Sequence, residues 1–202
     1  MTLSTEQGFP NWLAWGTMLR GWALTEQERG EEGIVQLRQG LVAYRATGAE
    51  TSRPYLLALL AEAYEKAGRV EEALSSLAEA LAAADNNGDH WYEAELYRLK
   101  GTLTLQSKVQ GLKSKVQEAE ECFLKAIDIA RNQQAKSLEL RAATSLARLW
   151  HQQSKRAEAH ELLSEVYNWF TEGFDTKDLQ EAKALLDSLA SGVRGPEPKG
   201  GQ

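Results

Sequence analysis

The chain has 202 residues, of which 43% are hydrophobic and 26% are charged, so a chain that is disordered throughout is excluded. The net charge of -6 weighs against a nucleic-acid backbone as the main partner, because phosphate binding needs a basic surface. Neither an apolar run long enough for a membrane span nor a basic segment followed by an apolar leader is present, so we expect no membrane association and no signal peptide.

Helix-forming residues dominate the sequence, and all four prolines lie outside the interiors of the helical patterns. These features predict an all-α fold in a single domain, residues 1–190. Apolar residues at helical spacing predict helix pairs at about 9–47 (9–28 with 31–47), 53–86 (53–67 with 70–86), 90–134 (90–106 with 115–134) and 137–171 (137–153 with 155–171). A capping helix is expected at 176–190, and residues 191–202 have too little apolar content to order.

Small residues recur at two fixed places in each predicted helix pair. The first series is Gly21, Ala61, Gly101 and Ala147, and the second is Gly33, Ala73, Ala119 and Ala159. The steps within each series are 40 or 46 residues. Two helices that cross closely need residues without bulk at the contact, so each pair should be a hairpin of one repeat. The six extra residues of the third repeat fall in the segment SKVQGLKSKVQ, which predicts a lengthened turn.

The second repeat resembles a known family. Its sequence, PYLLALLAEAYEKAGRVEEALSSLAEALAAAD, is similar to the tetratricopeptide (TPR) repeat at Leu60, Ala61, Tyr64, Gly68, Ala73, Leu77 and Ala80. The period of 40 is longer than the usual 34 of that family, so the joints between hairpins should be longer. The resemblance implies a right-handed α-solenoid of four hairpins with a capping helix, which acts as a protein-binding scaffold and not as an enzyme.

A narrower resemblance covers nearly the whole chain. Segments such as TEQGFPNWLAWGTMLRGWAL and AKSLELRAATSLARLW are similar to the C-terminal TPR region of bacterial signalling proteins that join an adenylate or guanylate cyclase to a STAND-type ATPase. The phosphate-binding pattern GxxxxGK[ST] is absent, so the catalytic activities of those proteins do not carry over. What the resemblance implies is a regulatory or sensor module in signalling.

The TPR resemblance also implies which residues face a concave peptide-binding groove. These residues are Trp15, Met18, Trp22, Tyr55, Glu62, Arg98, Arg141, Thr144, Arg148 and His151. Such a groove would be aromatic at one end and basic at the other, and would suit a peptide with an acidic or C-terminal carboxylate end. Two alternatives stay open: the Trp and Met residues could pack against a preceding repeat, and the arginines could form ion pairs with a neighbouring helix. A small-molecule ligand is an alternative occupant.

The first helix is apolar nearly all the way round, which is unusual for the first helix of a solenoid. Its apolar residues are Trp12, Leu13, Trp15, Met18, Leu19, Trp22 and Leu24. We expect either that the chain is a piece of a longer solenoid or that this helix mediates a homodimer or a contact with another partner.

Residue types that carry chemistry are sparse. His90, His151 and His160 are the only histidines, and none has the spacing of a metal site. No nucleophile is visibly paired with a base, so the sequence predicts no catalytic residues, no metal and no cofactor. Cys122 is the only cysteine, which fits a buried apolar position and a reducing, cytoplasmic location.

Overall fold

A computed structural model describes residues 2–108 and 111–191, and all regular structure in these two ranges is helical. The helices are α1 (Thr2–Glu6), α2 (Pro10–Glu26), α3 (Gly30–Ala46), α4 (Arg53–Lys66), α5 (Val70–Asn87), α6 (Glu93–Gln106), α7 (Leu112–Asn132), α8 (Lys136–Gln152), α9 (Arg156–Tyr167) and α10 (Lys177–Ser191). The predicted all-α fold is confirmed. Of the expected tail, only Ser191 is described, as the last residue of α10; residues 192–202 lie outside the described ranges.

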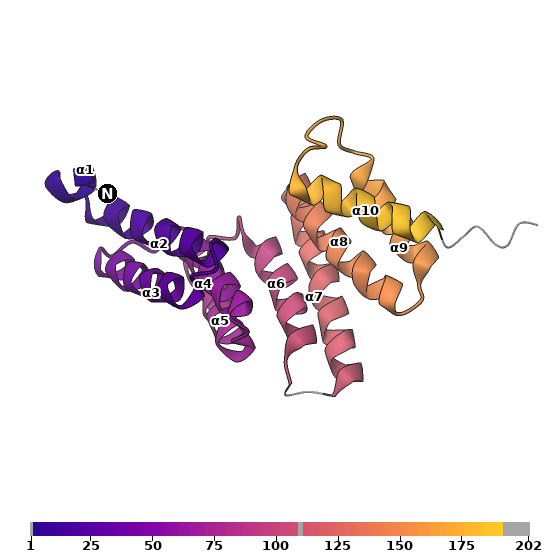
Figure 1. Cartoon of the computed structure of the whole chain (residues 1–202), viewed down its shortest axis with the longest axis horizontal. Coiled ribbons are helices and arrows are strands. Elements are labelled where there is room, and N and C mark those ends of the chain that lie inside the picture. Colours follow the sequence, from indigo (N-terminus) through magenta and orange to yellow (C-terminus); the bar gives the residue numbers. More distant parts are fainter. Residues whose placement is uncertain (1, 109–110, 192–202) are drawn as a thin grey trace, which may run out of the picture.

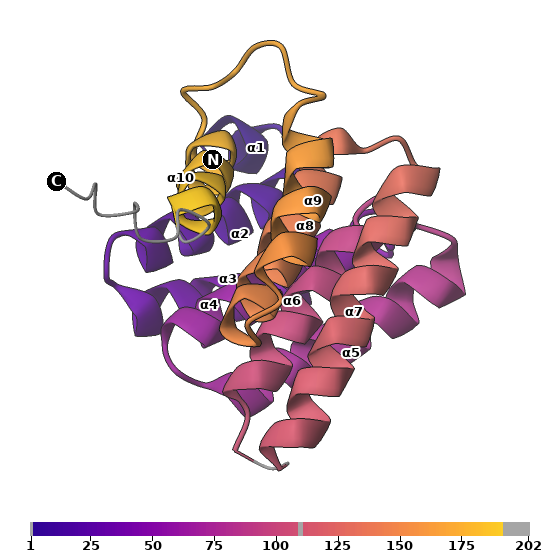
Figure 2. The same ribbon diagram turned by 90° about the vertical axis from the view of Figure 1, so that its right-hand side faces the viewer.

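Four hairpins stack along the long axis of the molecule (Figure 1). They are α2–α3, α4–α5, α6–α7 and α8–α9, and each one contacts the next. Successive hairpins are rotated relative to one another, as the end-on view shows (Figure 2). The final helix, α10, packs against α8 and α9 as the expected capping helix. None of the described helices has the length and apolar character needed to cross a bilayer.

All eight small residues of the two repeated series are buried. A Cβ atom added to Gly21 would lie 2.8 Å from the carbonyl oxygen of Gly33, and one added to Gly33 would lie 2.6 Å from the carbonyl oxygen of Gly21. Both distances are shorter than a Cβ atom tolerates, so α2 and α3 cross backbone against backbone. At Gly101, an added Cβ would lie 2.6 Å from the ring of Phe123.

Two segments differ from the expectations. A short helix, α1, precedes α2, where no helix was expected. In the third repeat, α7 begins at Leu112, three residues before the expected position, and has 21 residues against 18 in α5. The extra residues therefore lengthen the helix as well as the turn. The lysines and glutamine of this segment are good helix formers, which explains why the helix extends into it.

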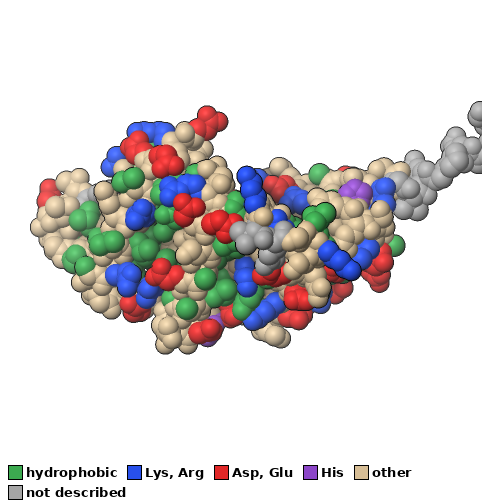
Figure 3. Space-filling model, turned by 90° about the horizontal axis from the view of Figure 1, so that it is seen from below, with side chains coloured by type: hydrophobic (Ala, Val, Ile, Leu, Met, Phe, Trp, Pro, Cys, Tyr) green, Lys and Arg blue, Asp and Glu red, His purple; other side chains and the backbone are tan. Residues whose placement is uncertain are grey.

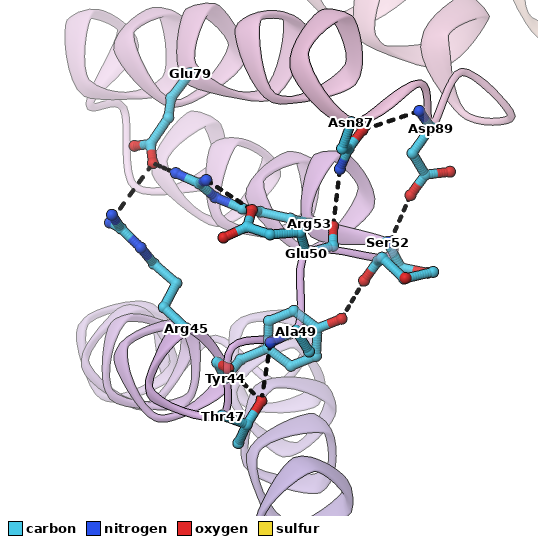
Figure 4. A network of polar contacts seen from close by, with 11 residues as sticks. Tyr44, Arg45, Thr47, Ala49, Glu50, Ser52, Arg53, Glu79, Asn87 and Asp89 are labelled. Atoms are coloured by element: carbon cyan, nitrogen blue, oxygen red, sulfur yellow. Dashed lines mark hydrogen bonds and ion pairs between the residues drawn. The ribbon is translucent and has the colours of Figure 1, made fainter.

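The connector between the first and second repeats is tied to the connector between the second and third (Figure 4). The side-chain amide of Asn87 donates to the carbonyl oxygen of Glu50 at 2.9 Å, and the backbone N–H of Ser52 donates to Asp89. Both bonds give partners to backbone groups of the connector between α3 and α4. They also fix the position of one hairpin relative to the next.

Candidate functional site

A groove of about 510 Å³ runs along the first helices of the hairpins. Its walls come from α2, α4, α6 and α8, and α10 closes one end. The residues that line it are Trp22, Glu26, Glu62, Glu65, Lys66, Arg98, Leu99, Arg141, Thr144, Ser145, Arg148, Lys177, Asp178 and Glu181. Acidic and basic side chains are equal in number, five of each, so the groove is polar and balanced in charge.

Side chains at equivalent places in successive repeats contact one another across the floor of the groove. The indole N–H of Trp22 donates to Glu62 at 3.3 Å, and Glu26 forms an ion pair with Lys66. In both pairs the two residues are 40 positions apart, which is the repeat period. The stacking of hairpins therefore determines the contacts of the groove floor directly.

A buried carboxylate lies under the middle of the groove. The side chain of Glu95 has no exposed surface. Its Oε1 atom accepts a hydrogen bond from the Nη2 atom of Arg98 and forms an ion pair with the Nη2 atom of Arg141, each at a nitrogen–oxygen distance of 2.7 Å. Its Oε2 atom is buried and has no hydrogen-bond partner in the described part of the chain. Removing one partner of a buried ion pair leaves an uncompensated charge, which is strongly destabilising. Arg98 and Arg141 therefore help to hold the fold around Glu95.

Glu62 is an acidic group of the groove whose environment favours the protonated form. Burial raises the pKa of Glu62, and the nearby carboxylate of Glu95 raises it further. The hydrogen bond from Trp22 and the guanidinium groups of Arg141 and Arg98 oppose this change without cancelling it. Glu62 therefore takes up a proton at a higher pH than an ordinary glutamate.

The capping helix α10 supplies the acidic partner at the far end of the groove. The Nη2 atom of Arg148 lies 2.6 Å from the Oε2 atom of Glu181, and Lys177 lies 3.8 Å from the same carboxylate. The hydrogen bond with Arg148 lowers the pKa of Glu181. Each of the three arginines expected to form a free basic end thus has a carboxylate partner, as in the ion-pair alternative.

Six of the ten expected groove residues lie together along the groove: Trp22, Glu62, Arg98, Arg141, Thr144 and Arg148. Trp15 and Tyr55 are stacked at 6.1 Å between ring centroids, in an aromatic cluster that continues through Trp91 and Tyr92 and does not line the groove. His151 also lies outside the lining, near the end of α8.

Met18 belongs to the core, so its expected place on the groove surface was wrong. Its side chain is completely buried, and its Cγ atom would lie 2.4 Å from a Cβ atom added to Gly40 on α3. The missing side chain at Gly40 leaves a space on α3 that Met18 fills. A helical spacing shared with Trp15 and Trp22 does not distinguish a groove residue from one that turns toward the second helix of its own hairpin.

Eight of the residues that line the groove are not among the ten expected ones. Glu26 could have been found, because it lies 40 residues before Lys66 and thus at the equivalent place in its repeat. Lys177, Asp178 and Glu181 belong to α10. This helix is not part of the repeat, so no repeat register predicts that it reaches the groove.

Charged and hydrophobic side chains are distributed differently over the surface outside the groove (Figure 3). Seen from the side of the α6–α7 turn, charges of both signs are spread along the whole length, and hydrophobic side chains gather toward the end formed by α2 and α3 (Figure 3). Within residues 2–108 and 111–191, no group of three or more His, Cys, Asp or Glu side chains is placed to hold a metal ion.

Known proteins resemble the chain mainly in fold. No protein-family model matches it. An uncharacterized protein of Rhizobium meliloti (strain 1021) is 28% identical over 132 residues, which are 65% of this chain, and the match spans only 12% of that relative's length.

Solved structures match over most of the chain. The TPR-like repeats of a putative kinesin light chain of Podosopora anserina are 22% identical, with a TM-score of 0.65, over 92% of this chain and 89% of that one. BtubC (BKLC) of P. vanneervenii is 18% identical, with a TM-score of 0.60, over 100% of this chain and 93% of that one. The fold is therefore a TPR-like α-solenoid of four hairpins and a capping helix.

Proposed function

We propose that the chain is a non-catalytic scaffold that binds a segment of another polypeptide in the groove. One observation carries this proposal: a carboxylate presented by a helix, Glu181 of α10, already lies in the groove at 2.6 Å from Arg148. A guanidinium group holds a carboxylate with directed hydrogen bonds. An acidic side chain or a C-terminal carboxylate of a partner would use the same group, beside Glu181 or in its place.

The lining of the groove fits a peptide better than a small molecule. Pockets for small ligands are mostly apolar and enclosed, whereas Trp22 and Leu99 are the only apolar residues among those that line this groove. A peptide offers donors and acceptors along its whole length, which matches a groove lined by both acidic and basic groups. TPR-like folds in general act as protein-binding scaffolds, and this chain shares their architecture.

Within this proposal, the chain serves as a regulatory or docking arm in bacterial signalling. The support is the sequence resemblance to the TPR region of cyclase and STAND-type ATPase proteins, together with a curated relative that is much longer than this chain. A single cysteine, buried at Cys122, suits a reducing, cytoplasmic setting.

Arg148 is the right residue for a test. Replacing Arg98 or Arg141 would expose the buried charge of Glu95 and disturb the fold, whereas the side chain of Arg148 is 47% exposed and has Glu181 as its ionic partner. The probe is an array of short peptides, each made with a free C-terminal carboxylate and with a C-terminal amide. We expect the wild-type chain to prefer free or acidic ends. Arg148→Ala should weaken that binding about tenfold or more, because a hydrogen bond between charged groups contributes on the order of 1.5–3 kcal/mol.

Lys183→Ala is the matched control. Lys183 lies on the same capping helix, forms its ion pair with Asp187 and does not line the groove, so peptide binding should be unchanged. Binding that is insensitive to Arg148→Ala, or an array on which no peptide binds, would contradict the proposed site.

A further inference from the structure

One face of α2 exposes apolar side chains without a partner in the described part of the chain. Trp12 is 69% exposed and Leu19 is 43% exposed. Gly16, which lies between them in the sequence, and Ala23, which follows Leu19, are half-buried. The spacing of four, three and four residues places all four on one side of the helix. None of the four is charged, which is typical of the centre of a protein interface.

Three of these four positions are buried in the second and third repeats. The equivalents of Gly16, Leu19 and Ala23 one and two periods later are at most 4% exposed; they are Leu56, Leu59 and Ala63 in α4, and Leu96, Leu99 and Leu103 in α6. The helix α2 contacts the short α1, its hairpin partner α3 and α4 of the next hairpin, whereas α4 contacts α5, α6 and both helices of the preceding hairpin. The open face of α2 is therefore the face through which this fold stacks one helical unit on another.

The residues of this face form a pattern that matches itself when the helix is reversed. Reversal about the point between Thr17 and Met18 exchanges position 12 with 23 and position 16 with 19. Each exchange sets a large residue opposite a small one: Trp12 opposite Ala23, and Leu19 opposite Gly16. A twofold axis between two antiparallel helices brings about this exchange, because an isologous interface uses the same patch on both subunits.

We propose that this face is an interface between two copies of the chain, with their α2 helices antiparallel across a twofold axis. Because the alternation of large and small residues is complementary to itself on reversal, a second copy of the same helix fits this face without any change of sequence. The indole of Trp12 acts as the main anchor on each side, and it packs over the second copy's helix where Ala23 leaves room. The arrangement uses none of the residues that line the groove, so both grooves of the dimer stay open.

The test is the oligomeric state of the full chain, measured by sedimentation velocity over a wide range of protein concentration. We expect a reversible dimer in the wild type. Trp12→Ala should raise the dissociation constant about tenfold or more, because it removes an aromatic anchor from each side. Ala23→Trp should weaken the dimer as well, because it sets two indoles against each other. The double variant Trp12→Ala/Ala23→Trp exchanges the large and the small residue and should restore the dimer toward wild-type strength.

The matched control is Val42→Ala, since Val42 on α3 is exposed to the same degree as Trp12, 69% in each case. It should leave the dimer unchanged, and circular dichroism should show that every variant keeps its helix content. A wild-type chain that is monomeric at all concentrations overturns the proposal. So does a double variant no stronger than the weaker of the single ones, or a control that weakens the dimer as much as Trp12→Ala. Peptide binding in the groove is measured separately on the same variants, so the two proposals fail independently.

Discussion

In the first and second repeats the two helices of the hairpin cross at equivalent positions, but the helices approach each other more closely in the first repeat. In the first repeat, Gly21 and Gly33 leave no room for a Cβ atom, because each would meet a backbone oxygen of the facing helix at 2.8 Å or less. In the second repeat, the equivalent residues are Ala61 and Ala73, and both are fully buried without such a conflict. One fold therefore accommodates two crossing geometries, and the small residue at each contact determines which one is adopted.

A second contact between the helices of each hairpin also differs between these two repeats. Met18 on α2 fills the space above Gly40 on α3, whereas the equivalent pair in the second repeat is Ala58 and Ala80. Both pairs are buried. The volume missing from one helix of the first repeat is supplied by the other, which keeps the core filled.

Among the substitutions that test this comparison, Met18→Ala should lower the free energy of unfolding most. The change opens a cavity in the first repeat, and a loss of about 3 kcal/mol in the free energy of unfolding is expected. Urea unfolding followed by circular dichroism measures it. The double variant Met18→Ala/Gly40→Ala reproduces the pair of the second repeat and should recover part of the loss. A single variant that loses less than about 1 kcal/mol would contradict the packing assigned to Met18.

Gly21→Ala should come next, with a loss of about 2 kcal/mol in spite of the better helix propensity of alanine. The reason is that the added methyl group must push apart two backbones. Gly30→Ala is the control in the same hairpin, because no atom lies within 4 Å of a Cβ atom there. That change should be neutral or stabilising by up to about 1 kcal/mol. Thermal melts that move in the same direction for both variants would argue against the close crossing.

Ala73→Gly is the reverse substitution: it places in the second repeat the glycine that the first repeat has at the equivalent position. The crossing in the second repeat does not need glycine, so the variant should gain no closer packing and should lose about 1 kcal/mol of stability through the greater freedom of the unfolded chain. Hydrogen exchange should become faster in α4 and α5 and stay unchanged in α8 and α9. A stabilised variant would show that the alanine-based crossing is strained.

Glu62→Gln should have the smallest effect on stability. Glu62 lies at the position that Trp22 occupies in the first repeat. Because burial and Glu95 raise the pKa of Glu62, the folded chain binds a proton more tightly than the unfolded chain. Stability from this group therefore increases as the pH falls from above its raised pKa toward the ordinary glutamate value, about 4.3. The variant lacks this contribution, so the difference in melting temperature between wild type and Glu62→Gln should change across that window. A difference that is constant with pH would contradict the assignment.

The local features of this fold could be predicted from the sequence. Among the residues that the structure describes, apolar periodicity and the recurrence of glycine and alanine placed nine of the ten helices close to their observed bounds, because these signals depend on residues near one another in the chain. The helix α1 was not predicted, because five residues are too few to show a periodic pattern. The register of the repeats was also enough to bring Trp22, Glu62 and Arg148 to one groove, since equivalent places in stacked units face the same side.

The sequence by itself thus determined the helices, their pairing into hairpins and the side on which a groove forms. Only the tertiary structure decided that Met18 is core, that Glu95 forms ion pairs with both Arg98 and Arg141, and that Glu181 of the capping helix reaches Arg148. The physical reason is distance along the chain. Periodicity reports the face on which a side chain lies, whereas a charge is paired by whatever packs against that face, and α10 stands outside the repeat that the sequence displays.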